Sequence, residues 1–203
     1  GSGTLAAGIF SGLRADRSDL ADGLAYEPVE INEHRRSEIR ERLGPGIQPR
    51  ERGMTGRFTG VVLANEFLDA LPLRQLIRTA DGWREVMVAT EGDRFVGVPG
   101  ARPMAAALPE SRRGEPEGTL IETSPAAAAV LYEVAGRLAQ QAGAALFVDY
   151  GYAEERTGST FQAVRRHEKV DPFAAPGEAD LTAHVDFAML AQVAQSRGAR
   201  WLG

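Results

Sequence analysis

The chain has 203 residues, 43% of them hydrophobic and 25% charged, a composition typical of a globular protein that can bury one core. It has no cysteine, which excludes disulfides, thiolate metal sites and cysteine nucleophiles, and its three scattered histidines argue against a structural metal site. The formal net charge of −5 argues against nucleic acid as a main partner, and no apolar run approaches membrane-spanning length, so we expect no membrane insertion.

The first residues predict a glycine-rich turn that leads into a helix. Leu5, Ile9, Phe10 and Leu13 recur at helical spacing directly after Gly1-Ser2-Gly3-Thr4. Backbone N–H groups left free at such a helix start can bind a charged or polar group of a cofactor. A Gly-Ser beginning is also compatible with a cloning remnant.

Residues 24–31 predict a strand that ends on Glu30, followed by a helix over 33–43 capped by Asn32. An acidic residue at this place suits the two hydroxyl groups of a ribose, because a carboxylate accepts from both. The alternative is a solvated glutamate with no ligand. Pro28 removes a ladder donor and is unusual in a central strand.

After residues 44–59, which predict no clear element, the apolar run 60–65 predicts a buried strand. The run ends on Asn65 and Glu66, with Asp69 three residues further on and a proline at position 72 that stops continuation. An amide and two carboxylates thus come together at the carboxyl end of a strand, the edge where open α/β sheets bind ligands. The alternative is that Asn65 and Asp69 merely cap a turn or a helix.

Residues 73–98 predict a β-hairpin insertion that turns at Asp81-Gly82, and 99–118 predict a loop. A helix should begin at Ser124-Pro125 and end at Gly143. Residues 144–148 predict another buried strand, which ends on Asp149-Tyr150. A long polar segment over 152–180 then precedes a last helix that begins near residues 180–182.

Buried strands that alternate with helices predict an α/β fold with a doubly wound, mostly parallel sheet. We expect one domain over residues 1–203, with an insertion at about 73–118. The polar strand ends, Glu30, Asn65-Glu66 and Asp149-Tyr150, should then line one edge of the sheet.

Three stretches of the chain resemble the MidA family of S-adenosylmethionine-dependent protein-arginine methyltransferases, which includes a mitochondrial complex I assembly factor. They are Asn65-Glu66-Phe67-Leu68-Asp69-Ala70-Leu71-Pro72, Val148-Asp149-Tyr150-Gly151, and the run from Pro176 to Phe187. Gly1-Ser2-Gly3-Thr4-Leu5 resembles the end of the family's glycine-rich cofactor motif, and Val29-Glu30 its acidic strand end. Members of this family continue beyond both ends of the region matched, so we expect the chain to be part of a longer protein.

The resemblance implies a class I methyltransferase (Rossmann-like) fold, with S-adenosyl-L-methionine as cofactor and a protein arginine as methyl acceptor. Glu66, Asn65 and Asp69 are the expected catalytic residues. Gly1, Gly3, Thr4, Glu30 and Asn65 are expected to bind the cofactor. His167, Asp180 and His184 are expected to wall the substrate pocket, although each histidine is as easily a packed or surface residue.

The chemistry of arginine methylation explains why carboxylates are expected in this site. A guanidinium group is protonated and delocalised, so it is a poor nucleophile. Carboxylates orient it, localise its charge and favour a lone pair on one nitrogen. Two alternatives stay open, a small-molecule nitrogen or oxygen acceptor and a non-catalytic assembly or binding module with the same fold. We expect a bacterial, cytoplasmic protein.

Overall fold

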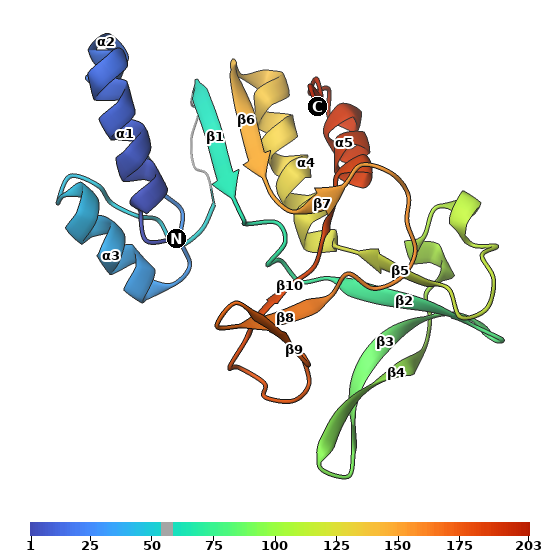
Figure 1. Ribbon diagram of the computed structural model, residues 1–203. Helices are drawn as coiled ribbons and strands as arrows, with labels where there is room; N and C mark the ends of the chain where they lie inside the picture. The colour runs from blue at the N-terminus through green and yellow to red at the C-terminus, as the bar shows by residue number, and fades with distance from the viewer. Residues whose placement is uncertain (54–58) are drawn as a thin grey trace. The chain divides into compact units, whose positions relative to one another are not determined.

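The computed structural model describes residues 1–53 and 59–203, which form a mixed α/β structure (Figure 1). Residues 54–58, part of the stretch for which the sequence predicts no element, lie outside the described residues. The chain divides into two compact units, Gly1–Arg57 and Phe58–Gly203. The single domain expected over residues 1–203 stays a prediction.

The first unit has helices α1 (Thr4–Asp16), α2 (Ser18–Ala21) and α3 (Glu33–Leu43) in its described part. Helix α1 begins after Gly3, whose φ of 83° lies in the left-handed region that glycine adopts without strain. Helix α3 begins after Asn32, whose side chain accepts a hydrogen bond from the Arg35 N–H at 3.1 Å. Ile39 of α3 is 2% exposed and lies 3.5 Å from where a β-carbon on Gly3 would be. Both helices begin where the sequence predicts.

The predicted strand over residues 24–31 is wrong. In the described part of the chain this segment forms only an isolated bridge between Val29 and Arg50. The Arg50 N–H donates to the Pro28 carbonyl at 2.8 Å, and the Glu30 N–H donates to the Arg50 carbonyl at 2.9 Å. Pro28 has no N–H with which to extend a ladder. Glu30 therefore ends a short extended segment and not a strand.

The second unit contains the two predicted strands that matter for the site. Strands β1 (Gly60–Asn65) and β6 (Gly143–Val148) pair in parallel, in register from Gly60 opposite Gly143 to Asn65 opposite Val148. Helices α4 (Pro125–Gln140) and α5 (Phe187–Ser196) pack against each other behind this pair (Figure 1). The carboxyl ends of β1 and β6 therefore lie side by side.

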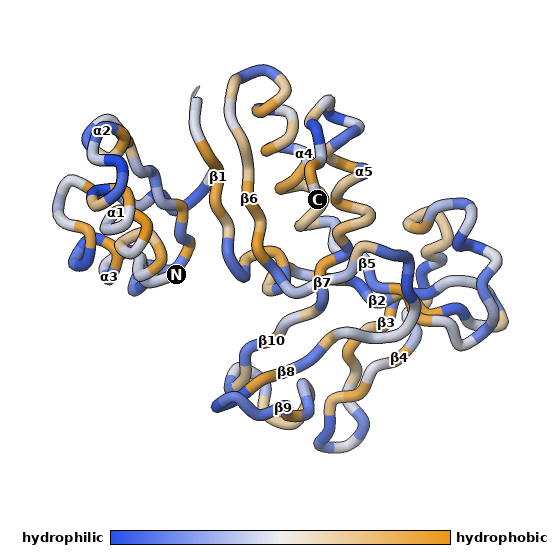
Figure 2. The backbone as a smooth tube through the Cα atoms, turned by 45° about the horizontal axis from the view of Figure 1, so that its top comes forward, coloured by the Kyte–Doolittle hydropathy of each residue, from blue (hydrophilic) through white to orange (hydrophobic). Residues whose placement is uncertain are grey.

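The core of this region lies between the helices and the ends of the strands. Leu68, Leu131, Val185 and Leu190 are each at most 5% exposed and form one cluster with Ala127. Figure 2 shows hydrophobic stretches along β1 and β6. The expectation that both strands are fully buried is wrong, since Val61 is 70% and Leu146 54% exposed. Within this unit the helices cover only one face of the pair.

The insertion forms a four-stranded antiparallel sheet in the order β4-β3-β2-β5. Its strands are β2 (Arg74–Thr79), β3 (Gly82–Glu91), β4 (Arg94–Pro103) and β5 (Leu120–Thr123). The predicted hairpin is confirmed, with Gly82 as the first residue of β3. The predicted loop over 99–118 is wrong at its start, because β4 runs to Pro103, and the rest of it contains the short helices η1 (Ala105–Ala107) and η2 (Glu110–Arg112). Buried Leu76 and Trp83 fix this sheet to that segment.

The segment after β6 is more ordered than its polar sequence predicts. It contains β7 (Gly151–Tyr152), β8 (Gln162–Arg165), β9 (Glu168–Val170), β10 (Asp180–Thr182) and β11 (Val185–Asp186). The predicted helix start near 180–182 is wrong, because β10 pairs with β8 and α5 begins at Phe187. The Asp186 side chain caps α5 by accepting from the Met189 N–H at 2.9 Å. No helix among the described residues has the length and hydropathy of a transmembrane segment.

Gly151 offers a test of this packing. It pairs with Val185, and a β-carbon at position 151 would overlap the Val185 carbonyl oxygen and lie 2.6 Å from the Phe187 ring. We expect Gly151→Ala to lower the free energy of unfolding by about 1–3 kcal/mol, the usual cost of overpacking. Urea denaturation measures this. Gly114→Ala is the control, since no atom lies within 4 Å of a β-carbon there. Equal stability of both variants would contradict the packing of β7 against β11.

Candidate active site

The parallel pairing of β1 and β6 brings two of the predicted polar strand ends together. Asn65 is opposite Val148, so Glu66 and Asp149 are the first residues beyond the paired strands. The Glu66 N–H donates to the Val148 carbonyl at 2.8 Å, which extends the contact by one residue. The third predicted strand end, Glu30, belongs to the first unit.

Glu66 begins a tight turn. Its φ of 48° lies in the left-handed region, which an L residue with a side chain rarely adopts. Such a conformation persists only where the surrounding structure fixes it. Here the three following N–H groups all point to the Asp149 carboxylate. Oδ2 accepts from Phe67 at 3.4 Å and Leu68 at 3.2 Å, and Oδ1 accepts from Asp69 at 3.3 Å.

Asp69 lies inside this turn and differs from Glu66 in its environment. Asp69 is 9% exposed, whereas Glu66 is exposed. Burial, followed by the charge of Asp149 and a hydrogen bond with it, raises the pKa of Asp69 to about 6. The charge of Glu66 acts in the same direction. The backbone carbonyl of Asp69 accepts from the Ala183 N–H at 3.0 Å, which attaches the turn to the C-terminal segment.

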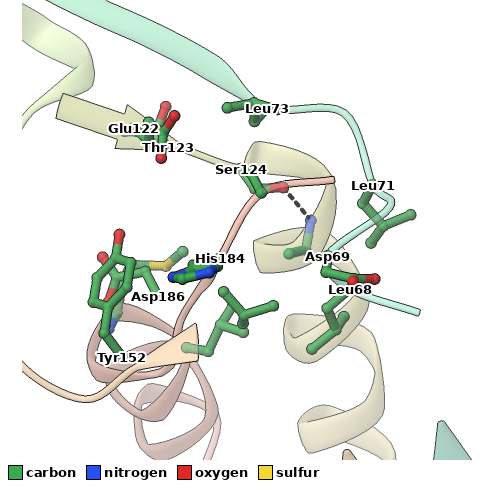
Figure 3. A pocket seen from close by; sticks show the side chains of 15 residues that line it. Leu68, Asp69, Leu71, Leu73, Glu122, Thr123, Ser124, Tyr152, His184 and Asp186 are labelled. Carbon is green, nitrogen blue, oxygen red and sulfur yellow. Dashed lines mark hydrogen bonds between the residues drawn. The ribbon is translucent and has the colours of Figure 1, made fainter. Parts of the chain in front are cut away.

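Asp69 and His184 line one small cavity of about 30 Å³ (Figure 3). This volume holds about one water molecule. The other polar side chains around it come from β5, the start of α4, β7 and β11, and they are Glu122, Thr123, Ser124, Tyr152 and Asp186. Burial, with the charges of Asp186 and Glu122, raises the pKa of Tyr152 to about 12, so its hydroxyl group keeps its proton at neutral pH.

The structure separates the three expected substrate residues. His184 lines the cavity with Asp69, and the backbone N–H of His184 donates to the Thr160 hydroxyl at 2.9 Å. Asp180 is exposed at the start of β10, opposite Val164 of β8. His167 is exposed in the turn between β8 and β9, with a left-handed φ of 67°. Asp180 and His167 thus belong to one three-stranded sheet, and His184 to the cavity.

The expected cofactor residues other than Asn65 lie in the first unit, where the turn and the acidic residue meet. Glu30 Oε2 accepts from the Gly1 nitrogen, and Oε1 accepts from the Asn32 N–H at 2.9 Å. The Glu30 side chain is 15% exposed. Thr4, the first residue of α1, shares a hydrogen bond with the Ser2 hydroxyl at 2.9 Å. The glycine turn at the start of α1 and Glu30 therefore lie in the same unit, where the sequence leads us to expect the cofactor.

Two acidic residues have roles beyond those predicted from the sequence. Asp149 is expected only as a polar strand end, yet it is the acceptor for the whole 67–69 turn. Glu122 accepts from the Gln75 side chain at 2.8 Å and from the Thr160 N–H at 3.0 Å, which fastens the segment before β8 to the insertion sheet. Each follows an apolar run, and that position is the only signal in the sequence. No group of residues that could hold a metal ion occurs in the described part of the chain.

Comparison with known proteins gives matches to all or to part of the chain. A family model for S-adenosyl-L-methionine-dependent methyltransferases matches residues 1–203. The mitochondrial protein arginine methyltransferase NDUFAF7 of Rattus norvegicus is 40% identical over 140 residues, 66% of this chain and 31% of that protein. The Homo sapiens protein of the same name is 38% identical over 140 residues, with the same shares. The match thus spans about a third of the length of these relatives.

Two crystal structures from Burkholderia thailandensis are similar to the entire chain at 32% identity. One, of an uncharacterised protein, has a TM-score of 0.80 and is covered over 57% of its length. The other is bound to S-adenosyl-homocysteine, has a TM-score of 0.77 and is covered over 55% of its length.

The environment of Asp69 predicts how stability depends on pH. Because the pKa of Asp69 is raised to about 6, its protonated form favours the folded state. This contribution to the free energy of unfolding is lost as the pH rises from about 4 through 6. Asp69→Asn resembles the protonated form, so we expect it to be more stable than the wild type by about 1–2 kcal/mol at pH 8 and by much less at pH 4. Chemical denaturation at the two pH values measures the difference.

The control for this experiment is Asp93→Asn, which changes an exposed aspartate in the turn between β3 and β4. Its effect on stability should be within about 0.5 kcal/mol at both pH values. A wild type that stays more stable than Asp69→Asn at pH 8 would contradict the raised pKa.

Proposed function

The chain belongs to this family of S-adenosyl-L-methionine-dependent methyltransferases, and from this membership we propose that it transfers a methyl group to an arginine side chain of a protein substrate. The observation that carries the proposal is the turn after β1, which presents an exposed carboxylate, Glu66, beside a buried one, Asp69. The names of the rat and human relatives support arginine as the acceptor.

We further propose that β1 and β6 belong to the doubly wound sheet of a class I methyltransferase. Their parallel pairing and the helix α4 between them in the sequence support this. In such sheets the ligand binds beyond the carboxyl ends of the strands, where Asn65, Glu66 and Asp149 lie in this chain. A bacterial, cytoplasmic location remains part of the proposal.

In this proposal the first unit binds the cofactor. Gly1, Gly3 and Thr4 form the turn and the start of α1, whose free N–H groups suit a carboxylate, and Glu30 accepts from the ribose hydroxyls. The cofactor supplies an electrophilic methyl group on a sulfonium. Asn65 can orient the amino-acid end of the cofactor or the target nitrogen.

Glu66 binds the acceptor guanidinium, with Asp69 as the second carboxylate. A charged, bidentate contact fixes the orientation of the guanidinium plane and concentrates its positive charge away from the reacting nitrogen. His184 lies at the cavity beside Asp69, and Asp180 and His167 supply exposed polar groups on the neighbouring sheet for a protein substrate.

The substrate is tested by incubating the full-length protein with isotopically labelled cofactor and lysate proteins, followed by mass spectrometry. Label on arginine residues is expected. Label on small molecules alone would favour the small-molecule acceptor. No S-adenosylhomocysteine binding by the full-length protein in calorimetric titration would favour a non-catalytic module.

Glu30→Ala tests the cofactor site. The variant loses charge-assisted hydrogen bonds to the ribose, worth about 1.5–3 kcal/mol, so affinity for S-adenosylhomocysteine should fall by more than about tenfold. Isothermal titration calorimetry on the full-length protein measures it. The control is Glu27→Ala, whose side chain is 59% exposed on the same segment and pairs with Arg50 at 3.4 Å. Equal affinities for the two variants would remove Glu30 from the cofactor site.

Glu66→Gln tests the acceptor site. The substitution keeps the shape and one acceptor oxygen but removes the charge, so turnover should fall by on the order of a hundredfold. Affinity for S-adenosylhomocysteine should stay within about threefold, because the residues that bind the cofactor are unchanged. Glu154→Gln, at an exposed position in the same unit, is the control.

Two results would count against the role of Glu66. If the variant no longer binds S-adenosylhomocysteine, the residue belongs to the cofactor site. If its turnover is intact, the acceptor is not held by this carboxylate, and a small-molecule acceptor becomes the better explanation.

A further inference from the structure

Asp149 is the residue on which the geometry of the proposed acceptor site depends. Its carboxylate accepts from the N–H groups of Phe67, Leu68 and Asp69 at 3.2–3.4 Å. Three converging N–H groups form a concave anion site, which in this chain is filled by a side chain of the neighbouring strand. The left-handed Glu66 is held between this contact and its own bond to Val148.

The same carboxylate lies against the buried carboxyl group of Asp69. Two carboxyl groups in contact cannot both ionise without cost, so a proton on Asp69 is stabilised by the charge of Asp149. Glu66 is the other charged group that acts on Asp69 from the turn itself. The titratable groups around the adjoining cavity come from four other elements or segments, and they are Glu122, Tyr152, His184 and Asp186.

We propose that Asp149 is a positioning residue of the methyl transfer, which holds the 66–69 turn and makes the Asp69 carboxylate the acceptor of the proton that the guanidinium group releases. The inference rests on the function proposed above and assigns a different role to each of the two carboxylates of the turn. Glu66, which is exposed, binds the guanidinium group, and Asp69, which is buried, takes the proton.

The reaction requires such an acceptor. The lone pair of one guanidinium nitrogen forms the new bond to the methyl carbon, and the carbon–sulfur bond breaks with its electron pair moving to sulfur. The sulfonium becomes a neutral thioether, and the nitrogen gives up one proton, so that the methylated guanidinium keeps a single positive charge. A carboxylate whose pKa is raised to about 6 by burial and by Asp149 is ionised at neutral pH and is a better base than an ordinary aspartate.

The first test measures the carboxyl group of Asp69 directly and needs no substrate. In the full-length protein, labelled with ¹³C at the aspartate carboxyl carbons, the Asp69 signal is identified by its absence in Asp69→Asn. We expect it to titrate near pH 6 in the wild type and at least about one pH unit lower in Asp149→Asn. In Asp171→Asn, which alters an aspartate that accepts from the Phe173 N–H in a distant turn of the sequence, it should not move.

The second test follows the reaction. Formation of methylarginine in lysate proteins, measured with labelled cofactor, should fall on the acid side of a midpoint near pH 6 in the wild type. Asp149→Asn should move this midpoint to lower pH and reduce turnover about tenfold at pH 8, with little change in S-adenosylhomocysteine affinity. Asp69→Asn should remove the midpoint and lower turnover at every pH. A purely structural role for Asp149 would lower turnover without moving the midpoint.

The outcomes separate this inference from the proposed function. If Asp69 titrates near pH 4 in the wild type, or at an unchanged pH in Asp149→Asn, the inference is overturned whatever the enzyme methylates. If Asp149→Asn does not fold, the coincidence of the Asp69 titration with the kinetic midpoint in the wild type supports the inference, and a mismatch overturns it. If lysate arginine is not methylated but the Asp69 titration behaves as expected, the proposed substrate fails, and with it the proton transfer from a guanidinium group, whereas the effect of Asp149 on the Asp69 carboxyl group stands.

Discussion

The hydrogen bonds that the Asp149 carboxylate accepts from the turn after β1 determine the geometry of the polar edge of the second unit. Parallel strands end at the same side of a sheet, so β1 and β6 deliver Glu66 and Asp149 next to each other. The N–H groups of the turn after β1 have no strand partner and would otherwise need solvent. Asp149 accepts three of them, and this contact allows Glu66 to remain in a conformation that costs about 1–3 kcal/mol.

The rest of the unit packs onto that turn. Leu68, on the turn itself, is 3% exposed in the cluster with Leu131 and Leu190 from the two helices. The Asp69 carbonyl accepts from Ala183, and two residues later β11 pairs with β7 beside Gly151. The hydrophobic cluster around Leu68 and the segment that contains Ala183 thus both contact the turn. These contacts explain how a short loop can position acidic side chains.

The sequence predicts local elements well where one signal decides them. Ser124 and Asn32 cap helices as expected, and the 60–65 and 144–148 runs form strands. Prediction from the sequence fails where the pairing partner of a segment determines its secondary structure. Residues 180–182 have the composition of a helix start, but β8 offers them a strand partner, and Glu30 lacks the ladder that Pro28 interrupts. His167 likewise lies in a hairpin turn that the residues around it do not predict.

The same limit applies to the site. Asn65, Glu66 and Asp69 can be recognised from the sequence because they share one turn, whereas Asp149 lies 80 residues from Asp69 and is brought to it only by strand pairing. A sequence also gives no measure of burial, and burial is what makes Glu66 and Asp69 chemically different. Glu66 is exposed to solvent, whereas burial and the neighbouring Asp149 raise the pKa of Asp69 to about 6. Two similar side chains three residues apart thus differ in their chemistry.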